Sequence, residues 1–387
     1  MRAGPLEVFV VALRLGVTSF GGPIAHLGYF RTEYVERRRW LDDRAFAELV
    51  ALGQFLPGPT SSQVGMAVGY TRAGFPGALA SWTGFTLPSA AIMTVFGAIA
   101  TGGAVSGDEV WLRALKLVAV AVVLNAVIGM AQQLAATPRT AVVAALTAAA
   151  LLALPESGLI QVACLVVAAV VGLVVFRSQA LAEPGELPIH LRHRTGLAAL
   201  TAFAGLLAVL PLLAGIGVLP ELAVAMYRAG ALVFGGGHVV LPLLETEIVP
   251  DLISETEFLA GYGMAQALPG PLFTFATYLG QVAAGLSGAV VATVAIFLPG
   301  SLILFGVLPF WQQVRSDSRV QAAIVGVNAA VVGLLGAAWI DPITTGSITS
   351  ALDVAYATAL FLALHFFKAP PWLVVITAVA ASPLLGL

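Results

Sequence analysis

The sequence predicts an all-α polytopic membrane protein made of two inverted-topology repeats with broken or re-entrant helices. Of its 387 residues, 59% are hydrophobic and 10% are charged, whereas soluble domains carry about 25% charged residues. Many of its apolar runs approach the ~20 residues that a spanning helix needs. The runs lack the regular alternation of apolar and polar residues that is typical of a membrane β-barrel.

Two interrupted apolar segments open the chain. The first covers residues 6–28 and is broken at 20–23, and the second covers 45–72 and is broken at 57–59. The stretch between them, 31–48, is rich in arginine. Each break should end one helix and begin another, because glycine tolerates unusual backbone angles and proline suits the first turn of a helix.

The second half repeats this order after a polar linker. Interrupted apolar segments lie at residues 221–241 and 258–283, with an acidic stretch at 245–257 between them. Uninterrupted runs that approach spanning length are predicted at 75–100, 111–135, 140–154, 159–177, 195–215, 287–311, 320–340, 349–366 and 371–387.

An ordered series of matching residues relates the two halves. The matches are Arg14, Gly16, Phe20, Gly21 and Gly22 with Arg228, Gly230, Phe234, Gly235 and Gly236, then Phe46, Gln54, Pro57, Gly58 and Pro59 with Phe258, Gln266, Pro269, Gly270 and Pro271, and then Gly74, Gly77 and Pro88 with Gly285, Gly288 and Pro299. We therefore divide the chain into an N-terminal transmembrane repeat at 1–180, a cytoplasmic linker at 181–194 and a C-terminal transmembrane repeat at 195–387.

Loop charges predict that the repeats are inverted. The stretch 31–48 contains five arginines, whereas the equivalent stretch 245–257 contains acidic residues and no Lys or Arg. The positive-inside rule places the first in the cytoplasm and the second outside. In this topology each broken segment is a hairpin that enters and leaves by one face. The alternative, which fits the charges less well, is that the broken segments cross as discontinuous helices.

Each break is predicted to hold a helix N-terminus inside the membrane. Such an end presents free N–H groups and about half a positive charge, which favours an anion, and unwound helices at a repeat interface are typical of secondary transporters. The residues predicted to bind a substrate are Ser19, Phe20, Gly21, Gly22, Pro23, Gln54, Gly58, Thr60, Ser61, Phe234, Gly235, Gly236, Gly237, Gln266 and Gly270. The alternative is capping or interhelical hydrogen bonding for the hydroxyls, and tight helix packing for the glycines.

Four ionisable residues near the breaks are candidates for electrostatic or coupling roles, namely Arg14, His26, Arg228 and His238. The arginines could hold a dianion or extend to the membrane interface. The histidines could couple proton movement to transport, or they could be hydrogen-bonded structural residues. The mid-span residues Asn125 and Asn328 are interpreted as polar groups that join helices.

Other chemistries find no support in the sequence. We see no metal-ligand spacing, nucleophile elbow or zinc-protease motif, so we predict no metal, no cofactor and no enzymatic activity. The net charge of −2 gives no reason to expect a nucleic-acid partner. The predicted partners are the lipid bilayer, a small anion, a coupled proton and a second copy of the chain in a homodimer.

Several long motifs resemble the signature blocks of the chromate ion transporter (CHR) family. They are GVTSFGGPIAH at 16–26, the arginine-rich stretch that ends in Trp40-Leu41, QFLPGP at 54–59, FGGGHVVLPLL at 234–244 and QALPGP at 266–271. Because they occur in both halves, the chain resembles the long, fused form of the family. The resemblance implies a multi-pass protein of the bacterial inner membrane. It would export chromate, driven by the membrane potential or a proton gradient, with sulfate as a competing or alternative anion.

Three alternative functions fit the same sequence features. They are a sulfate-type anion uptake carrier, a passive anion channel lined by the same breaks, and an intramembrane enzyme or a scaffold. The halves also differ, because the second Pro-Gly-Pro is followed by Leu272 and Phe273 where the first is followed by Thr60 and Ser61. In an anion site built from both breaks, the two halves would therefore contribute different chemical groups.

Overall fold

A computed structural model describes residues 4–101, 110–155, 158–176, 189, 191–234 and 239–385. These residues form helices and connecting loops, with no strand among them. Six of the described helices are long and apolar enough to cross a membrane. The predicted fold class, an all-α polytopic membrane protein, is therefore confirmed.

The helices follow the predicted order. The first half contains α1 (Pro5–Thr18), α2 (Gly22–Phe30), η1 (Arg31–Arg37), α3 (Asp43–Phe55), α4 (Thr60–Thr101), α5 (Val110–Leu134), α6 (Pro138–Ala153) and α7 (Gly158–Val175). The second half contains α8 (His193–Val209), η2 (Leu210–Leu213), α9 (Val218–Leu232), α10 (Val240–Ile248), α11 (Glu255–Ala267), η4 (Leu272–Thr274), α12 (Phe275–Val307), η5 (Leu308–Phe310), α13 (Trp311–Ser316), α14 (Ser318–Ala338), η6 (Trp339–Thr344), α15 (Ala351–His365) and α16 (Pro371–Leu385).

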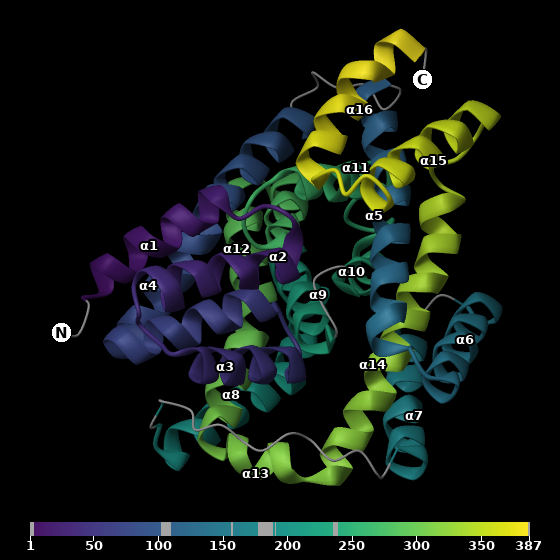
Figure 1. Cartoon of the computed structure of the whole chain (residues 1–387). Helices are drawn as coiled ribbons and strands as arrows, with labels where there is room; N and C mark the ends of the chain where they lie inside the picture. Colours follow the sequence, from purple (N-terminus) through teal and green to yellow (C-terminus); the bar gives the residue numbers. More distant parts are fainter. Residues whose placement is uncertain are drawn as a thin grey trace.

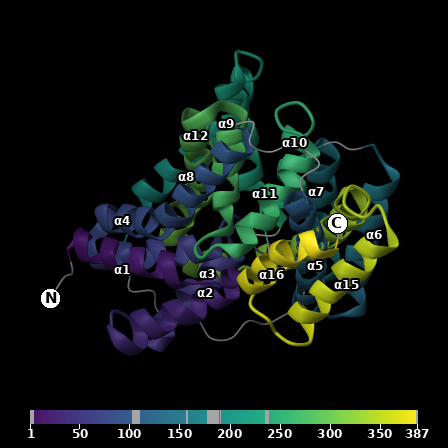
Figure 2. The same ribbon diagram turned by 90° about the horizontal axis from the view of Figure 1, so that it is seen from above.

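The helices gather in two groups, which both views separate (Figures 1 and 2). Helices α1–α4 pack with α8, α9 and α12, whereas α5–α7 pack with α14–α16. Between the groups, α11 contacts α5, α12 and α16, and α10 contacts α7 and α14. Each half thus contributes its broken segments to the first group or to the region between the groups, and its last three helices to the second group.

The predicted breaks are confirmed between α1 and α2, between α3 and α4, and between α11 and α12. Gly21, Gly58 and Gly270 have φ angles of +95°, +117° and +95°, a region that favours glycine over residues with a Cβ. Pro23 lies in the first turn of α2, where the missing N–H of proline does no harm. The fourth predicted break, at residues 234–237, falls between α9 and α10, and its residues 235–237 lie outside the described residues.

Each of the two longest helices, α4 and α12, is a tight helical hairpin. Gly74 (φ 64°, ψ −152°) and Gly285 (φ 64°, ψ −155°) form the turns with nearly identical backbone angles. In the first hairpin the arms touch through glycine, since a Cβ on Gly69 would lie 2.4 Å from the carbonyl oxygen of Gly77. Two matched turns of such unusual geometry support the predicted relationship between the halves.

The two hairpins also receive matched partners. Gly16 of α1 packs against the backbone of Phe85 in α4, and Gly230 of α9 packs against the backbone of Ile296 in α12. A Cβ would lie 2.7 Å from the carbonyl oxygen in the first contact and 2.2 Å in the second. Both contacts therefore depend on glycine and join equivalent pairs of helices.

The second arms of α4 and α12 run antiparallel. Phe75, just after the first turn, has its ring centroid 5.1 Å from that of Phe305, near the end of α12. Gly97, near the end of α4, packs against Gln281, just before the second turn. The two equivalent turns therefore lie at opposite ends of this helix pair. This geometry supports the inverted relationship of the repeats, and their orientation in a membrane stays a prediction.

Three predicted spans, at 140–154, 349–366 and 371–387, form helices that are shorter than a full crossing. Helices α6, α15 and α16 have 16, 15 and 15 residues, which rise about 22–24 Å at 1.5 Å per residue, whereas the hydrocarbon core is about 30 Å thick. Proline and capping residues fix the starts of these helices. Pro138 and Pro371 begin α6 and α16, and Ser350 caps α15.

Candidate functional site

The breaks of the two halves meet and exchange backbone hydrogen bonds. The N–H of Gly58 donates to the carbonyl of Val233 at 2.7 Å, and the N–H of Gly270 donates to the carbonyl of Ser19 at 2.9 Å. Ser19 and Val233 are equivalent positions, each preceding the phenylalanine of its half. Each Pro-Gly-Pro turn is therefore tied to the helix end of the other half.

A cavity of about 110 Å³ lies beside one of these junctions. Its lining comprises Gly21, Gly22, Val122, Asn125, Ala126, Ala265, Gln266, Leu268, Gly270, Leu272, Leu364 and Pro371. Roughly 10–15 Å³ on this scale holds one water molecule, so the cavity has room for an anion of a few heavy atoms. Four of the predicted substrate-binding residues, Gly21, Gly22, Gln266 and Gly270, are brought together here.

The cavity lining, in which most residues are apolar, includes hydrogen-bond donors. Gln266 Nε2 is buried and has no hydrogen-bond partner among the described residues. Gly21 and Gly22 are the N-cap and first residue of α2, so the positive end of that helix dipole faces the cavity. None of the described residues that line the cavity is charged. A buried donor without a partner is costly, and an oxyanion with several acceptor oxygens would satisfy it.

Asn125 and His365 join this site, although sequence reasoning assigned neither to it. Asn125 lines the cavity, and its Oδ1 lies 3.0 Å from Nδ1 of His365. When this imidazole nitrogen donates, the Asn125 oxygen is engaged and its NH₂ group is left to act as a donor. His365 stacks on Phe361 and meets Phe366 edge-on. Because α5 and α15 are far apart in sequence, the only local signal was a polar residue in each apolar run.

Several predicted residues lie outside the cavity lining. Gln54 is exposed at the end of α3, unlike its match Gln266. Thr60 in α4 donates to the carbonyl of Gly53 in α3 at 3.0 Å, which is the interhelical hydrogen bonding that the alternative predicted. The Phe20 ring packs 5.9 Å from that of Trp372. Pro23 serves as a helix start, and the buried Ser19 hydroxyl has no hydrogen-bond partner within the described part of the chain.

His26 links two breaks of the same half. It is buried, and its Nδ1 lies 3.3 Å from the hydroxyl oxygen of Ser61 at the start of α4. The His26 ring also meets the Phe85 ring edge-on at 5.4 Å. Nε2 of His26 has no hydrogen-bond partner among the described residues. The histidine is not part of the cavity lining, and its predicted coupling role stays a prediction.

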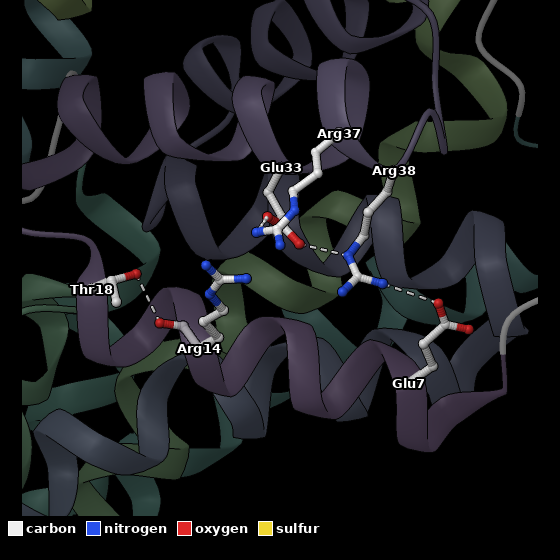
Figure 3. A network of polar contacts seen from close by, with 6 residues as sticks. All are labelled: Glu7, Arg14, Thr18, Glu33, Arg37 and Arg38. Carbon is white, nitrogen blue, oxygen red and sulfur yellow. Dashed lines mark hydrogen bonds and ion pairs between the residues drawn. The ribbon is translucent and has the colours of Figure 1, made fainter.

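The two candidate arginines have different surroundings. Arg14 lines an open cleft of about 630 Å³ between α1 and α2, and Figure 3 shows its side chain pointing toward Glu33 and Arg37. Among the described residues its guanidinium has no ion pair, because Glu33 instead accepts from Arg38 at 2.6 Å. In the second half, Arg228 donates to Glu247 at 3.2 Å.

The predicted residues of the remaining break are only partly described. Phe234 is half-buried, whereas Gly235, Gly236, Gly237 and His238 lie outside the described residues. The described site is therefore formed by the connection between α1 and α2 (the α1–α2 tip), the α11–α12 turn and the helices α5, α15 and α16.

Known proteins are similar to this chain over most of its length. The sequence matches the chromate transporter family over residues 6–176 and 220–382, one region in each half. It is 30% identical over 366 residues to a chromate transport protein of Pseudomonas aeruginosa, covering 87% of this chain and 80% of that protein. It is 29% identical over 339 residues to a probable chromate transport protein of Synechococcus elongatus, covering 84% and 81%. It is 28% identical over 334 residues to a chromate transport protein of Cupriavidus metallidurans, covering 85% of this chain and 80% of that protein.

No solved structure matches this chain. The chain therefore belongs to the chromate transporter family.

Proposed function

We propose that this protein exports chromate across the bacterial inner membrane as a secondary transporter. The observation that carries the proposal is the donor-lined cavity between the α1–α2 tip and the α11–α12 turn. The unpartnered Gln266 amide and the start of α2 offer hydrogen bonds to an oxyanion. The names of the similar proteins support chromate as the ion.

Binding by neutral donors suits a carrier. Amide and backbone N–H groups replace the water around the anion, while the absence of a full positive charge at the described lining prevents the dianion from being held too tightly to leave. The hydrogen bonds that Gly58 and Gly270 donate tie the tips of the two halves together. Movement of one tip therefore changes the contacts of the other, as alternating access requires.

Transport into proteoliposomes tests the proposal. The purified protein is reconstituted, a pH gradient or a membrane potential is imposed, and the movement of chromate is compared with that of sulfate. A secondary transporter accumulates chromate above its equilibrium distribution, and sulfate competes. Dissipation of gradients without accumulation would identify a channel, and accumulation of sulfate with exclusion of chromate would identify a sulfate carrier. Either result would contradict the proposal.

The site itself is tested by Gly22→Val at matched expression. Gly22 has φ +79°, which a β-branched residue rarely adopts, so the start of α2 would be displaced from the cavity. We expect chromate flux to fall at least about tenfold, because small misplacements of binding groups are costly. Gly205→Ala in α8 is the control, since a Cβ there meets nothing within 4 Å and the residue lines neither the cavity nor the cleft beside Arg14. Equal flux in both variants would exclude the α2 tip from the site.

A further inference from the structure

The two halves place an arginine and a glutamate at equivalent positions and pair them differently. Arg14 and Glu33 in the first half are separated by the same interval as Arg228 and Glu247 in the second. Arg228 and Glu247 form an ion pair between α9 and α10. Glu33 is held by Arg38 and Arg37 instead, so Arg14 faces the open cleft between α1 and α2.

The helix pairs α1–α2 and α9–α10 also differ in how exposed their second helices are. Tyr29 on α2 is 42% exposed, whereas its equivalent on α10, Leu243, is 4% exposed. The α10 arm is covered by α7, whose Gln161 donates to the carbonyl of Pro242 at 3.4 Å. The arms of α1–α2 are therefore spread, and those of α9–α10 are closed.

We propose that the cleft between α1 and α2 is an access site where Arg14 makes the first contact with the oxyanion, and that the Arg228–Glu247 ion pair closes the equivalent cleft of the other half. This inference rests on the proposed function. In the opposite transport state, Glu33 exchanges Arg38 for Arg14, and Glu247 releases Arg228. In each half, therefore, the arginine binds the anion while its cleft is open and binds the glutamate while its cleft is closed.

Thiol labelling tests the two clefts without measuring transport. Cys164, the single cysteine of the chain, is replaced by Ala. Thr18→Cys then reports the first cleft, and the equivalent Leu232→Cys reports the second. The probe anions are sulfate and molybdate, which do not oxidise thiols as chromate does. We expect either anion to slow the labelling of Thr18→Cys, and Arg14→Gln to abolish this protection. Arg44→Gln, at an exposed position outside the cleft lining, should retain it.

The closed cleft is tested by Glu247→Gln. Loss of an ion pair of ordinary strength changes an equilibrium about fivefold, so we expect Leu232→Cys to be labelled about fivefold faster. The exchanged pair Arg228→Glu with Glu247→Arg should restore slow labelling, which a merely misfolded variant would not do. Glu221→Gln, also on α9, is the matched control.

Each result decides the inference. Unchanged labelling of Leu232→Cys in Glu247→Gln, or failure of the exchanged pair to restore it, would overturn the closing role of the ion pair. Absence of anion protection at Thr18→Cys, or protection that persists in Arg14→Gln, would overturn the access site. If these labelling results hold while proteoliposomes accumulate no chromate, the clefts stand and the proposed transport function fails.

Discussion

At the residue scale, the matched glutamines Gln54 and Gln266 show how one repeated motif acquires two roles. Both precede a Pro-Gly-Pro turn, yet Gln266 lines the cavity with a buried, unpartnered donor and Gln54 is exposed. The difference arises from the neighbours of each turn. α11 packs against α5 and α16, which close the cavity around Gln266.

Replacing Gln266 with Leu should therefore weaken anion binding. A hydrogen bond to a charged partner contributes about 1.5–3 kcal/mol, so the Kd for sulfate or chromate should rise at least about tenfold when measured by calorimetry on the purified protein. Gln54→Leu is the matched control and should leave the Kd within about twofold. A similar loss in both variants would contradict the assignment of the site to the cavity.

The sequence predicted the parts of this site that depend on local backbone chemistry. Gly21 and Gly270 could be found because a helix break needs glycine at that position of the chain itself. Asn125 and His365 could not be placed, because their role depends on α5 and α15 meeting across a long separation in sequence. The pairing of Glu33 with Arg38 rather than Arg14 likewise depends on how η1 folds back, which no motif records.

At the element scale, glycine sets how closely the helices approach. Gly16 and Gly230 allow α1 and α9 to touch the backbones of α4 and α12, as small residues do at helix interfaces in membranes. Repetition of these glycines in the sequence predicted the relationship between the halves. The span predicted at 349–366 is longer than α15 (Ala351–His365), because apolar composition continues past the residues that cap this helix.

Gly230→Ala should destabilise the protein. The new Cβ would lie 2.2 Å from the carbonyl oxygen of Ile296, so the two helices must separate, and overpacking of this kind costs about 1–3 kcal/mol. Thermal unfolding in detergent should show a lower Tm than that of the parent protein. Gly28→Ala, which meets nothing within 4 Å, should not lower it. An unchanged Tm for Gly230→Ala would show that α9 and α12 can move apart without cost.

At the scale of the whole molecule, two sets of contacts lie at opposite ends of the antiparallel α4–α12 pair. At one end Trp311 donates to Glu48 at 3.3 Å, beside the arginine-rich stretch. At the other, Tyr278 of α12, which lies against Gly97 of α4, donates to the carbonyl of Glu257 in the acidic stretch at 3.0 Å. With the charge bias of the two stretches, this arrangement favours inverted repeats.

Accessibility from the two faces of the membrane tests this arrangement directly. In a Cys164→Ala background, Glu36→Cys and Asp251→Cys, both at exposed positions, should react with an impermeant thiol reagent from opposite faces. Two further exposed positions provide controls.

Asp317→Cys, just after α13, should be labelled from the same face as Glu36→Cys, and Thr345→Cys should be labelled from the same face as Asp251→Cys. The predicted topology, in which each broken segment enters and leaves by one face, requires this pattern. Labelling of Glu36→Cys and Asp251→Cys from one face would mean that the equivalent loops lie on the same side, and the halves could not then be inverted copies of each other.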